Sequence, residues 1–269
     1  MSTVAVGAGP GRPVRAAPHA IPLTRVTQVE LRKMFDTRSG FWLIASIVIT
    51  AFLATVGVIL FAPDSDLTYA TFVLAIKFPV AVILPMIAIL AVTSEWSQRS
   101  GLTTFTLVPH RHRVIAAKAI SSVLVGVVSV LVAFVIGALG NLAGTAITGT
   151  TLVWDVTVTA GLYFLLGNVM GMLIGFMLGV LIRASAGAIA AYFVYSFLLP
   201  TIFGLLAANV AWFRNLQPWV DIQFAQGPLF VFESTLTGEQ WANIVVTGVI
   251  WLVVPLAVGL GFVTRVEVK

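Results

Sequence analysis

The residue types that most often carry chemistry are scarce in this chain. Its 269 residues include no cysteine and three histidines, of which His110 and His112 are two apart and His19 lies far from both. Because this spacing lacks the His-x3-His pair of a helical zinc site, and no Gly-x-Ser-x-Gly elbow occurs, we predict no metal site and no catalytic residue. None of its four lysines completes a phosphate-binding Gly-x4-Gly-Lys-Ser/Thr loop. We therefore expect that the chain is not an enzyme and holds no cofactor of its own.

Composition instead points to the bilayer as the solvent. Hydrophobic residues make up 59% of the chain and charged residues 9%, with a mean hydropathy of +1.05, whereas a soluble domain is about 25% charged. A membrane-crossing helix needs about 20 apolar residues. Because lipid offers no partner to a backbone N–H group, each crossing segment must be helical. We predict an all-α membrane protein with six spans, at about 41–62, 70–93, 114–143, 158–182, 186–210 and 241–263.

The basic residues divide unequally between the two ends of these spans. The N-terminal arm, the loop after span two, the turn at Arg183 after span four and the C-terminal tail fall on one side and hold 13 of the 15 Lys and Arg residues. Arg214 falls on the other side, and Lys77 lies inside span two. The positive-inside rule then places both termini in the cytoplasm. We expect the chain to lie in the plasma membrane. It also explains a pI near 10 without a nucleic-acid partner.

Two stretches precede the first span. Residues 1–20 are small, rich in Pro and Gly and lack an apolar run, so we expect a flexible tail and not a signal peptide. Residues 21–40 predict an amphipathic helix on the inner leaflet, with a basic side toward lipid phosphates. The alternative is a cytosolic extension of span one. The expected apolar face holds Leu23, Thr27, Leu31, Met34 and Phe35, and the polar face Arg25, Gln28, Arg32 and Asp36.

The loop between spans two and three, residues 94–112, is the one sizeable connection on the basic side. It carries, in order, Glu95, Gly101, Thr103, Thr104, Pro109 and Arg111, with Lys118 beyond it. In order and spacing these residues resemble the first cytoplasmic loop of ABC-2 type transporter permeases. The stretches "LRKMFDTRSGFW" before span one and "VLIRASAGAIAAY" between spans four and five are also similar to parts of that family.

The resemblance implies a role for the loop. In that family a short coupling helix at this place docks into a cytoplasmic ATPase subunit, which binds ATP and Mg, and two permease subunits pair in the membrane. Carried over, the coupling helix would run from Glu95 to Gly101. The alternative is an ordinary loop whose bases only set topology. The expected docking residues are Glu95, Trp96, Gln98, Arg99, Gly101, Thr103, Thr104, Pro109 and Arg111.

Span two also carries the candidates for a substrate pathway. Lys77 either snorkels outward to the membrane surface or lines a pathway and meets an anionic or polar cargo. Pro79 and Pro85 interrupt the backbone hydrogen bonds of the same helix and offer kinks. Because spans two and five line the pathway and the dimer interface in the resembling family, Tyr192 and Tyr195 join these candidates.

Span four has a glycine at every fourth position: Gly167, Gly171, Gly175 and Gly179. A stripe without side chains lets another helix approach closely. The stripe is either a site of static packing or a seam that slides during transport. Asn168 lies beside it, and we expect its side chain to hydrogen-bond a neighbouring helix.

The function we expect is that of the permease subunit of an ATP-driven exporter. One alternative is a gradient-driven secondary transporter or channel, although such proteins usually place ionisable residues at mid-membrane and this chain has almost none. Another is a scaffold that recruits a partner without transporting anything. Residues 211–240 are aromatic but too polar to span, and form either an interfacial belt or a cap over the exit route.

Overall fold

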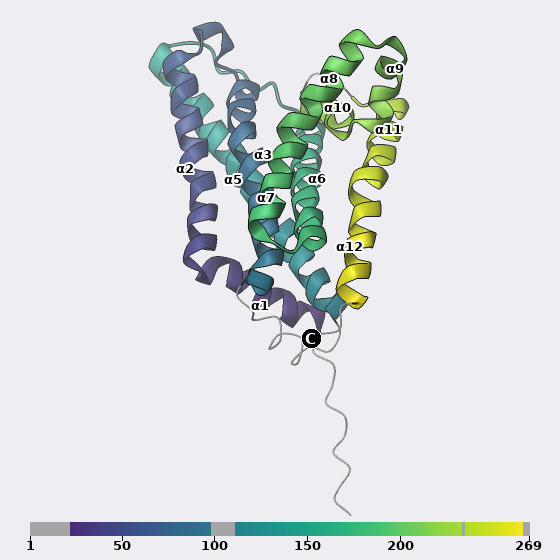
Figure 1. The fold of residues 1–269 in the computed structure, drawn as a ribbon. Helices are drawn as coiled ribbons and strands as arrows, with labels where there is room; N and C mark the ends of the chain where they lie inside the picture. Colours follow the sequence, from purple (N-terminus) through teal and green to yellow (C-terminus); the bar gives the residue numbers. More distant parts are fainter. Residues whose placement is uncertain (1–21, 98–110, 233–234, 266–269) are drawn as a thin grey trace, which may run out of the picture.

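The protein is a helical bundle in a computed structural model that describes residues 22–97, 111–232 and 235–265. Within these ranges all regular structure is helical, and six stretches are long and apolar enough to cross a membrane. Their axes run roughly parallel, side by side (Figure 1). The all-α, multi-pass prediction is therefore confirmed. The six stretches are Gly40–Phe61, Tyr69–Ser94, His112–Thr148, Val158–Ile182, Ser185–Asn209 and Gly238–Phe262.

The first four spans belong to α2 (Arg38–Phe61), α3 (Tyr69–Ser97), α5 (Arg111–Thr148) and α6 (Val158–Ile182). Helix α5 is longer than the predicted 114–143. Its last turns contain Asn141, Thr145 and Thr148, which the hydropathy pattern reads as polar. Asn141 donates its amide to the carbonyl of Val153, and both threonine hydroxyls bond carbonyls within α5. These side chains therefore continue the helix instead of ending it.

The fifth and sixth spans each contain one π-helical turn. The fifth consists of α7 (Ser185–Phe193), η2 (Val194–Leu198) and α8 (Leu199–Asn209). The sixth consists of α11 (Gly238–Gly248), η4 (Val249–Val253) and α12 (Val254–Arg265). Pro200 and Pro255 each come two residues after a π turn. Because a proline ring clashes with the carbonyl four residues earlier, the wider turn makes room for it without breaking the span.

The connections lie at the two ends of the bundle. Between α6 and α7, Arg183 adopts a left-handed conformation with φ of 59°, which ends α6 and confirms the tight turn predicted here. At the opposite end, the short helices α9 (Ala211–Val220), α10 (Ile222–Gln226) and η3 (Gly227–Phe230) link the fifth and sixth spans without crossing the bundle (Figure 1). A short 3-10 turn, η1 (Asp64–Asp66), links α2 to α3.

Helix α1 (Leu23–Asp36) crosses the foot of the bundle (Figure 1). Thr37 separates α1 from α2 and is the N-cap residue of α2. Its hydroxyl accepts a hydrogen bond from the N–H of Gly40. The buried face of α1 includes Thr27 and Met34 of the predicted apolar face, but it differs from the prediction at two positions. Glu30 is buried, whereas Phe35 is 49% exposed. The reason is that α1 packs on α5, where a charged partner meets Glu30, as described below.

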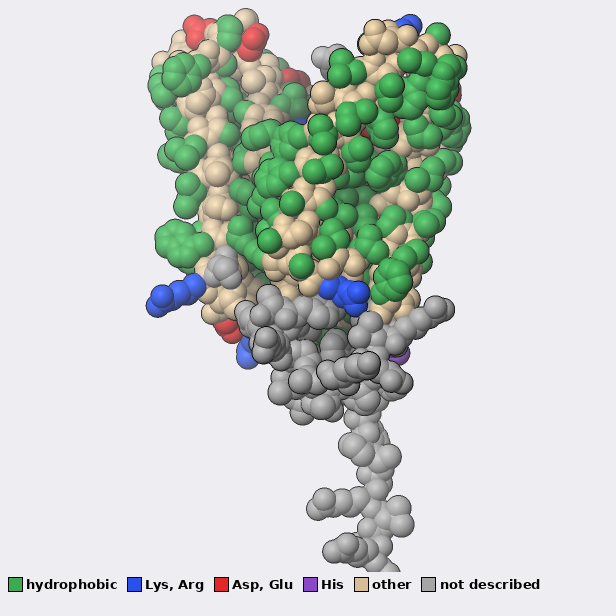
Figure 2. Space-filling model, in the orientation of Figure 1, with side chains coloured by type: hydrophobic (Ala, Val, Ile, Leu, Met, Phe, Trp, Pro, Cys, Tyr) green, Lys and Arg blue, Asp and Glu red, His purple; other side chains and the backbone are tan. Residues whose placement is uncertain are grey.

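Charged side chains mark the two ends of the molecule (Figure 2). Lysines and arginines gather at the end that carries α1 and the α6–α7 turn, and most of the acidic side chains in this view lie at the other end. That other end carries η1 with Asp64 and Asp66, and α9 with Arg214. Apolar side chains cover the sides between them, and many large ones are exposed there. This distribution suits a chain whose sides face hydrocarbon and whose ends face water.

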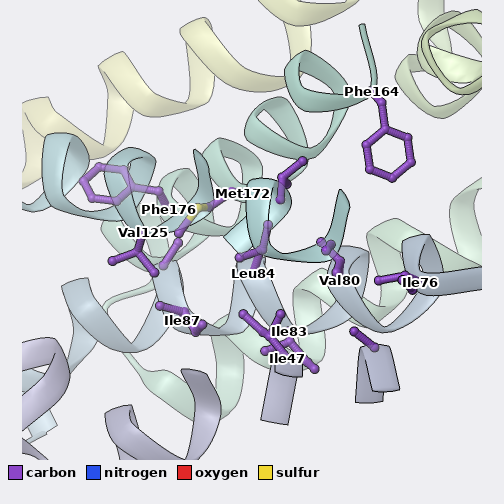
Figure 3. Close-up of a cluster of buried hydrophobic side chains, with 14 of the residues drawn as sticks. Ile47, Ile76, Val80, Ile83, Leu84, Ile87, Val125, Phe164, Met172 and Phe176 are labelled. Carbon is purple, nitrogen blue, oxygen red and sulfur yellow. The ribbon is translucent and has the colours of Figure 1, made fainter. Parts of the chain in front are cut away.

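Helix α3 lies at the centre of the core. It packs on α2, α5, α6 and α7. The buried side chains of α3 pack with buried side chains of α2, α5 and α6, and together they form one hydrophobic cluster (Figure 3). The cluster includes Ile47 of α2, Ile76, Val80, Ile83, Leu84 and Ile87 of α3, Val125 of α5, and Phe164, Met172 and Phe176 of α6.

Candidate functional site

A cavity of about 190 Å³ lies within the membrane-spanning region, between α3, α6, α7–η2 and the α10–η3 segment. Its lining on α3 starts eight residues into the helix, about 12 Å along the axis at 1.5 Å per residue. Four of the five predicted pathway residues on α3 and α7–η2 therefore come together here, next to Asn168 of α6. The polar side chains of the lining include Lys77, Asn168, Tyr192, Tyr195, Gln223 and Gln226.

The ammonium group of Lys77 lies over the ring of Phe230, 3.6 Å from its centroid. This is a cation–π contact, worth about 0.5–2 kcal/mol depending on how far water is excluded. Lys77 is half-buried, and no carboxylate bonds it among the residues that the structure describes. Lys77 lines the cavity, and snorkelling to the membrane surface and lining a substrate pathway both stay predictions. Contact with a cargo stays a prediction.

Phe230 reaches Lys77 because the α6 backbone is open beside it. A Cβ atom on Gly167 would lie 2.5 Å from the Phe230 ring, which no side chain tolerates. The ring also packs edge-on against Phe164, with centroids 5.6 Å apart. Phe230 was not among the predicted site residues. Its only signal was its place in the aromatic outer segment, which the sequence assigns to either a belt or a cap.

Pro85 explains the hydrogen bond that joins α7 to α3. A proline at position 85 has no N–H for the carbonyl of Ala81, four residues earlier. The hydroxyl of Tyr192 donates to that carbonyl at 2.7 Å. Tyr192 thus satisfies a backbone oxygen that would otherwise lack a partner in a region without water. Both residues line the cavity, whereas Pro79, also within α3, does not.

The π turn η2 brings a second tyrosine to the cavity. Tyr195 is buried, and its ring centroid lies 6.2 Å from that of Tyr192 and 5.9 Å from that of Trp251 in the other π turn, η4. Trp251 donates its ring N–H to the carbonyl of Val220 at the end of α9. The two π turns therefore meet through aromatic rings, and one of them is tied to the outer segment.

The glycine stripe of α6 is a packing surface at three of its four positions. A Cβ on Gly175 would lie 2.6 Å from the Pro85 carbonyl oxygen, and one on Gly179 would lie 3.3 Å from atoms of α3. Gly167 receives Phe230, as described above. Gly171 has nothing within 4 Å of a Cβ position and lines the cavity. A close helix contact at Gly171 was expected from the stripe, and that expectation is wrong.

Asn168 does not bond a neighbouring helix, contrary to prediction. Its amide donates to the carbonyl of Phe164 in α6 itself, at 2.8 Å. Its Oδ1 atom is buried and has no hydrogen-bond partner among the described residues, and the same holds for Nε2 of Gln226. Both residues line the cavity. The cavity wall therefore contains a cation and two amide groups with unused hydrogen-bonding capacity.

A second polar cluster ties the foot of the bundle together. The ammonium of Lys118 on α5 bonds Glu30 of α1 at 2.6 Å and the carbonyl of Ala91 on α3 at 2.9 Å. Lys33 bonds the other oxygen of Glu30 at 2.7 Å. Glu30 and Lys118 are both buried. Ser121 of α5 adds a bond to a carbonyl of α1. Glu30 was not among the predicted functional residues.

The predicted docking residues lie mostly outside the described residues. This holds for Gln98, Arg99, Gly101, Thr103, Thr104 and Pro109. Glu95 and Trp96 belong to the last turn of α3, which runs on to Ser97, so they do not begin a separate helix as expected. Arg111 is the first residue of α5. The two ends of this loop are therefore continuous with the helices that Lys118 joins.

Among the described residues, no three His, Asp or Glu side chains lie together as a metal site. The arrangement can hold polar or charged groups between the spans. No family model matches the chain, and no curated protein matches it.

Proposed function

We propose that the chain is the membrane-spanning permease subunit of an ATP-driven exporter of the ABC-2 type. A separate ATPase subunit, holding ATP and Mg, would dock on the 94–112 loop from the cytoplasm. A second permease subunit, identical or related, would complete the transporter in the plasma membrane. The end of the molecule that carries the bases would face the cytoplasm, with α1 against the inner leaflet.

The observation that carries this proposal is the Lys118 cluster. Lys118 bonds α1 through Glu30 and α3 through the carbonyl of Ala91, and it lies on α5. Helices α3 and α5 are the two that lead into the 94–112 loop. A push on this loop would therefore move the feet of three helices together, instead of bending one of them.

Helix α3 would carry that movement to the cavity. Its residues Lys77 and Pro85 line the cavity wall, and Pro85 packs on Gly175 of α6. The carbonyl freed by the proline bonds Tyr192 on α7. A shift of α3 would thus change the cavity and its contact with the fifth span, which is what alternating access needs.

Affinity purification of the full chain from its native membrane tests the proposal. We expect an ATPase with a phosphate-binding loop to co-purify, and we expect charge reversal by Glu95→Arg with Arg99→Glu to remove it. Arg183→Glu is the matched control, because Arg183 lies at the same end of the bundle but in the α6–α7 turn. Its ATPase should be retained. Absence of any nucleotide-hydrolysing partner would refute the proposal and favour a gradient-driven transporter or a scaffold.

A further inference from the structure

We propose that the cavity is a binding site for the oxyanion head group, carboxylate or phosphate, of an amphiphile whose apolar body lies outside the cavity. The inference rests on the proposed function only in regarding this amphiphile as cargo. The binding itself is a property of the chain alone. Three features carry it: the charge of the wall, the size of the space and the nature of its rim.

The charge of the wall selects an anion. Lys77 brings a positive charge about 12 Å along α3, into a region where burying a charge without a counter-charge is unfavourable. The Phe230 ring faces the ammonium at 3.6 Å but covers only one side of it. An ammonium has three N–H donors, and a ring cannot accept all three as oxygens do. An oxyanion would supply both the counter-charge and the acceptors.

Two amide groups extend this polar surface. Within the described part of the chain, Nε2 of Gln226 is buried and has no hydrogen-bond partner, so it is a further donor for an oxyanion. Oδ1 of Asn168 is likewise buried and unbonded there, and it can accept from a hydroxyl of the same head group. Both side chains are at least nine-tenths buried, with exposures of 5% and 4%. Buried polar groups left unpaired are uncommon, so a ligand that bonds them is a physical explanation of their presence.

The size of the space argues for a head group and not a whole molecule. Pockets that enclose a drug-sized ligand measure about 300–1,000 Å³, and this cavity measures about 190 Å³. An oxyanion with a few attached carbons would occupy it. The remainder of a longer ligand would have to extend past the rim.

The rim is apolar and reaches the outside of the chain. Phe78 of α3 is 67% exposed and Phe197 of η2 is 45% exposed, and their rings meet edge-on with centroids 6.5 Å apart. Both residues also line the cavity. An alkyl body could therefore lie against these rings while its head group reaches Lys77. A free inorganic anion would gain nothing from this rim.

Direct binding to the purified full chain in a non-ionic detergent tests the inference. The probes are dodecyl phosphate and dodecanoate, with dodecanol, dodecyltrimethylammonium and inorganic phosphate for comparison, each measured by native mass spectrometry. We expect the two anionic amphiphiles to bind and the other three to bind at least tenfold more weakly. Lys77→Met should weaken anionic binding at least tenfold, and Lys77→Arg should keep it within about threefold. Lys33→Met, which removes a lysine at the foot of the bundle, should leave it unchanged.

Three outcomes would overturn the inference: dodecanol binding as well as dodecyl phosphate, inorganic phosphate binding as well as its dodecyl ester, or binding unaffected by Lys77→Met. Because Lys77→Met replaces a half-buried ammonium with an apolar side chain, the variant should fold, and Phe230→Leu provides a second variant that keeps the charge. Phe230→Leu should change binding by less than Lys77→Met does. No ATPase takes part in this binding assay, so its result does not depend on whether the proposed exporter function is correct. Failure of the binding inference would likewise leave the result of the ATPase co-purification unchanged.

Discussion

The buried pair of Glu30 and Lys118 gives the sharpest stability prediction. The two side chains are 5% and 4% exposed and meet at 2.6 Å. Glu30→Leu removes the carboxylate and leaves a buried ammonium that still bonds the carbonyl of Ala91. Removing one partner of a buried ion pair costs about 3–5 kcal/mol, because the remaining charge stays out of water. We therefore expect Glu30→Leu to lower the free energy of unfolding by that amount.

The double variant separates this effect from ordinary loss of packing. Replacing both members of a buried pair with apolar residues is often neutral or stabilising. Glu30→Leu combined with Lys118→Met should therefore recover about 2 kcal/mol or more relative to Glu30→Leu alone. Lys118→Met alone leaves Glu30 its bond to Lys33 at 2.7 Å, so the carboxylate keeps a counter-charge.

Lys33→Met is the matched control for this series. Its side chain is 47% exposed, and exposed ion pairs contribute about 0.2–1 kcal/mol. Thermal unfolding in detergent, followed by circular dichroism, should place Lys33→Met and the double variant above both Lys118→Met and Glu30→Leu. The reasoning is refuted if Glu30→Leu is as stable as Lys33→Met, or if the double variant is less stable than Glu30→Leu.

Two further substitutions test the contacts of α3 by the same unfolding measurement. Gly175→Ala should destabilise the chain by about 1–3 kcal/mol, because its Cβ would lie 2.6 Å from the backbone oxygen of Pro85. The control Gly171→Ala has open space around its Cβ and should change stability little. Equal losses of stability in the two variants would contradict the packing described. Tyr192→Phe should lower the free energy of unfolding by about 0.6–2 kcal/mol, since the carbonyl freed by Pro85 loses its donor. The control Tyr163→Phe should be neutral, because the Tyr163 hydroxyl has no hydrogen bond among the described residues. A neutral Tyr192→Phe would show that the bond to the Ala81 carbonyl does not stabilise the fold.

The six spans could be predicted from the sequence because the bilayer imposes a length and a composition that few other structures require. The turn at Arg183 could be predicted for the same reason, since an arginine inside a continuous helix of that length would lie in hydrocarbon. The end of α5 could not. Asn141 is polar, but it is satisfied by the carbonyl of Val153, and that bond depends on where the following loop passes.

The ion pair at the foot of the bundle could not be predicted either. Glu30 and Lys118 are 88 residues apart, so no local spacing connects them. Periodicity placed Phe35 on the apolar face of α1 and gave Glu30 no partner. Since burial of a carboxylate depends on a cation from another helix, the sequence of α1 alone misplaces these two residues, although it predicts the burial of Thr27 and Met34.

The glycine stripe shows how one pattern can produce both a contact and a space. Each glycine removes a side chain, but what fills the gap depends on the facing element. Phe230 fills it at Gly167 and Pro85 fills it at Gly175, so bulky groups enter on either side of Gly171. These two groups keep the neighbouring segments apart, and the missing side chain at Gly171 therefore leaves the cavity open. The position of the cavity follows from packing on both sides of it, which is why spacing alone predicted a uniform seam.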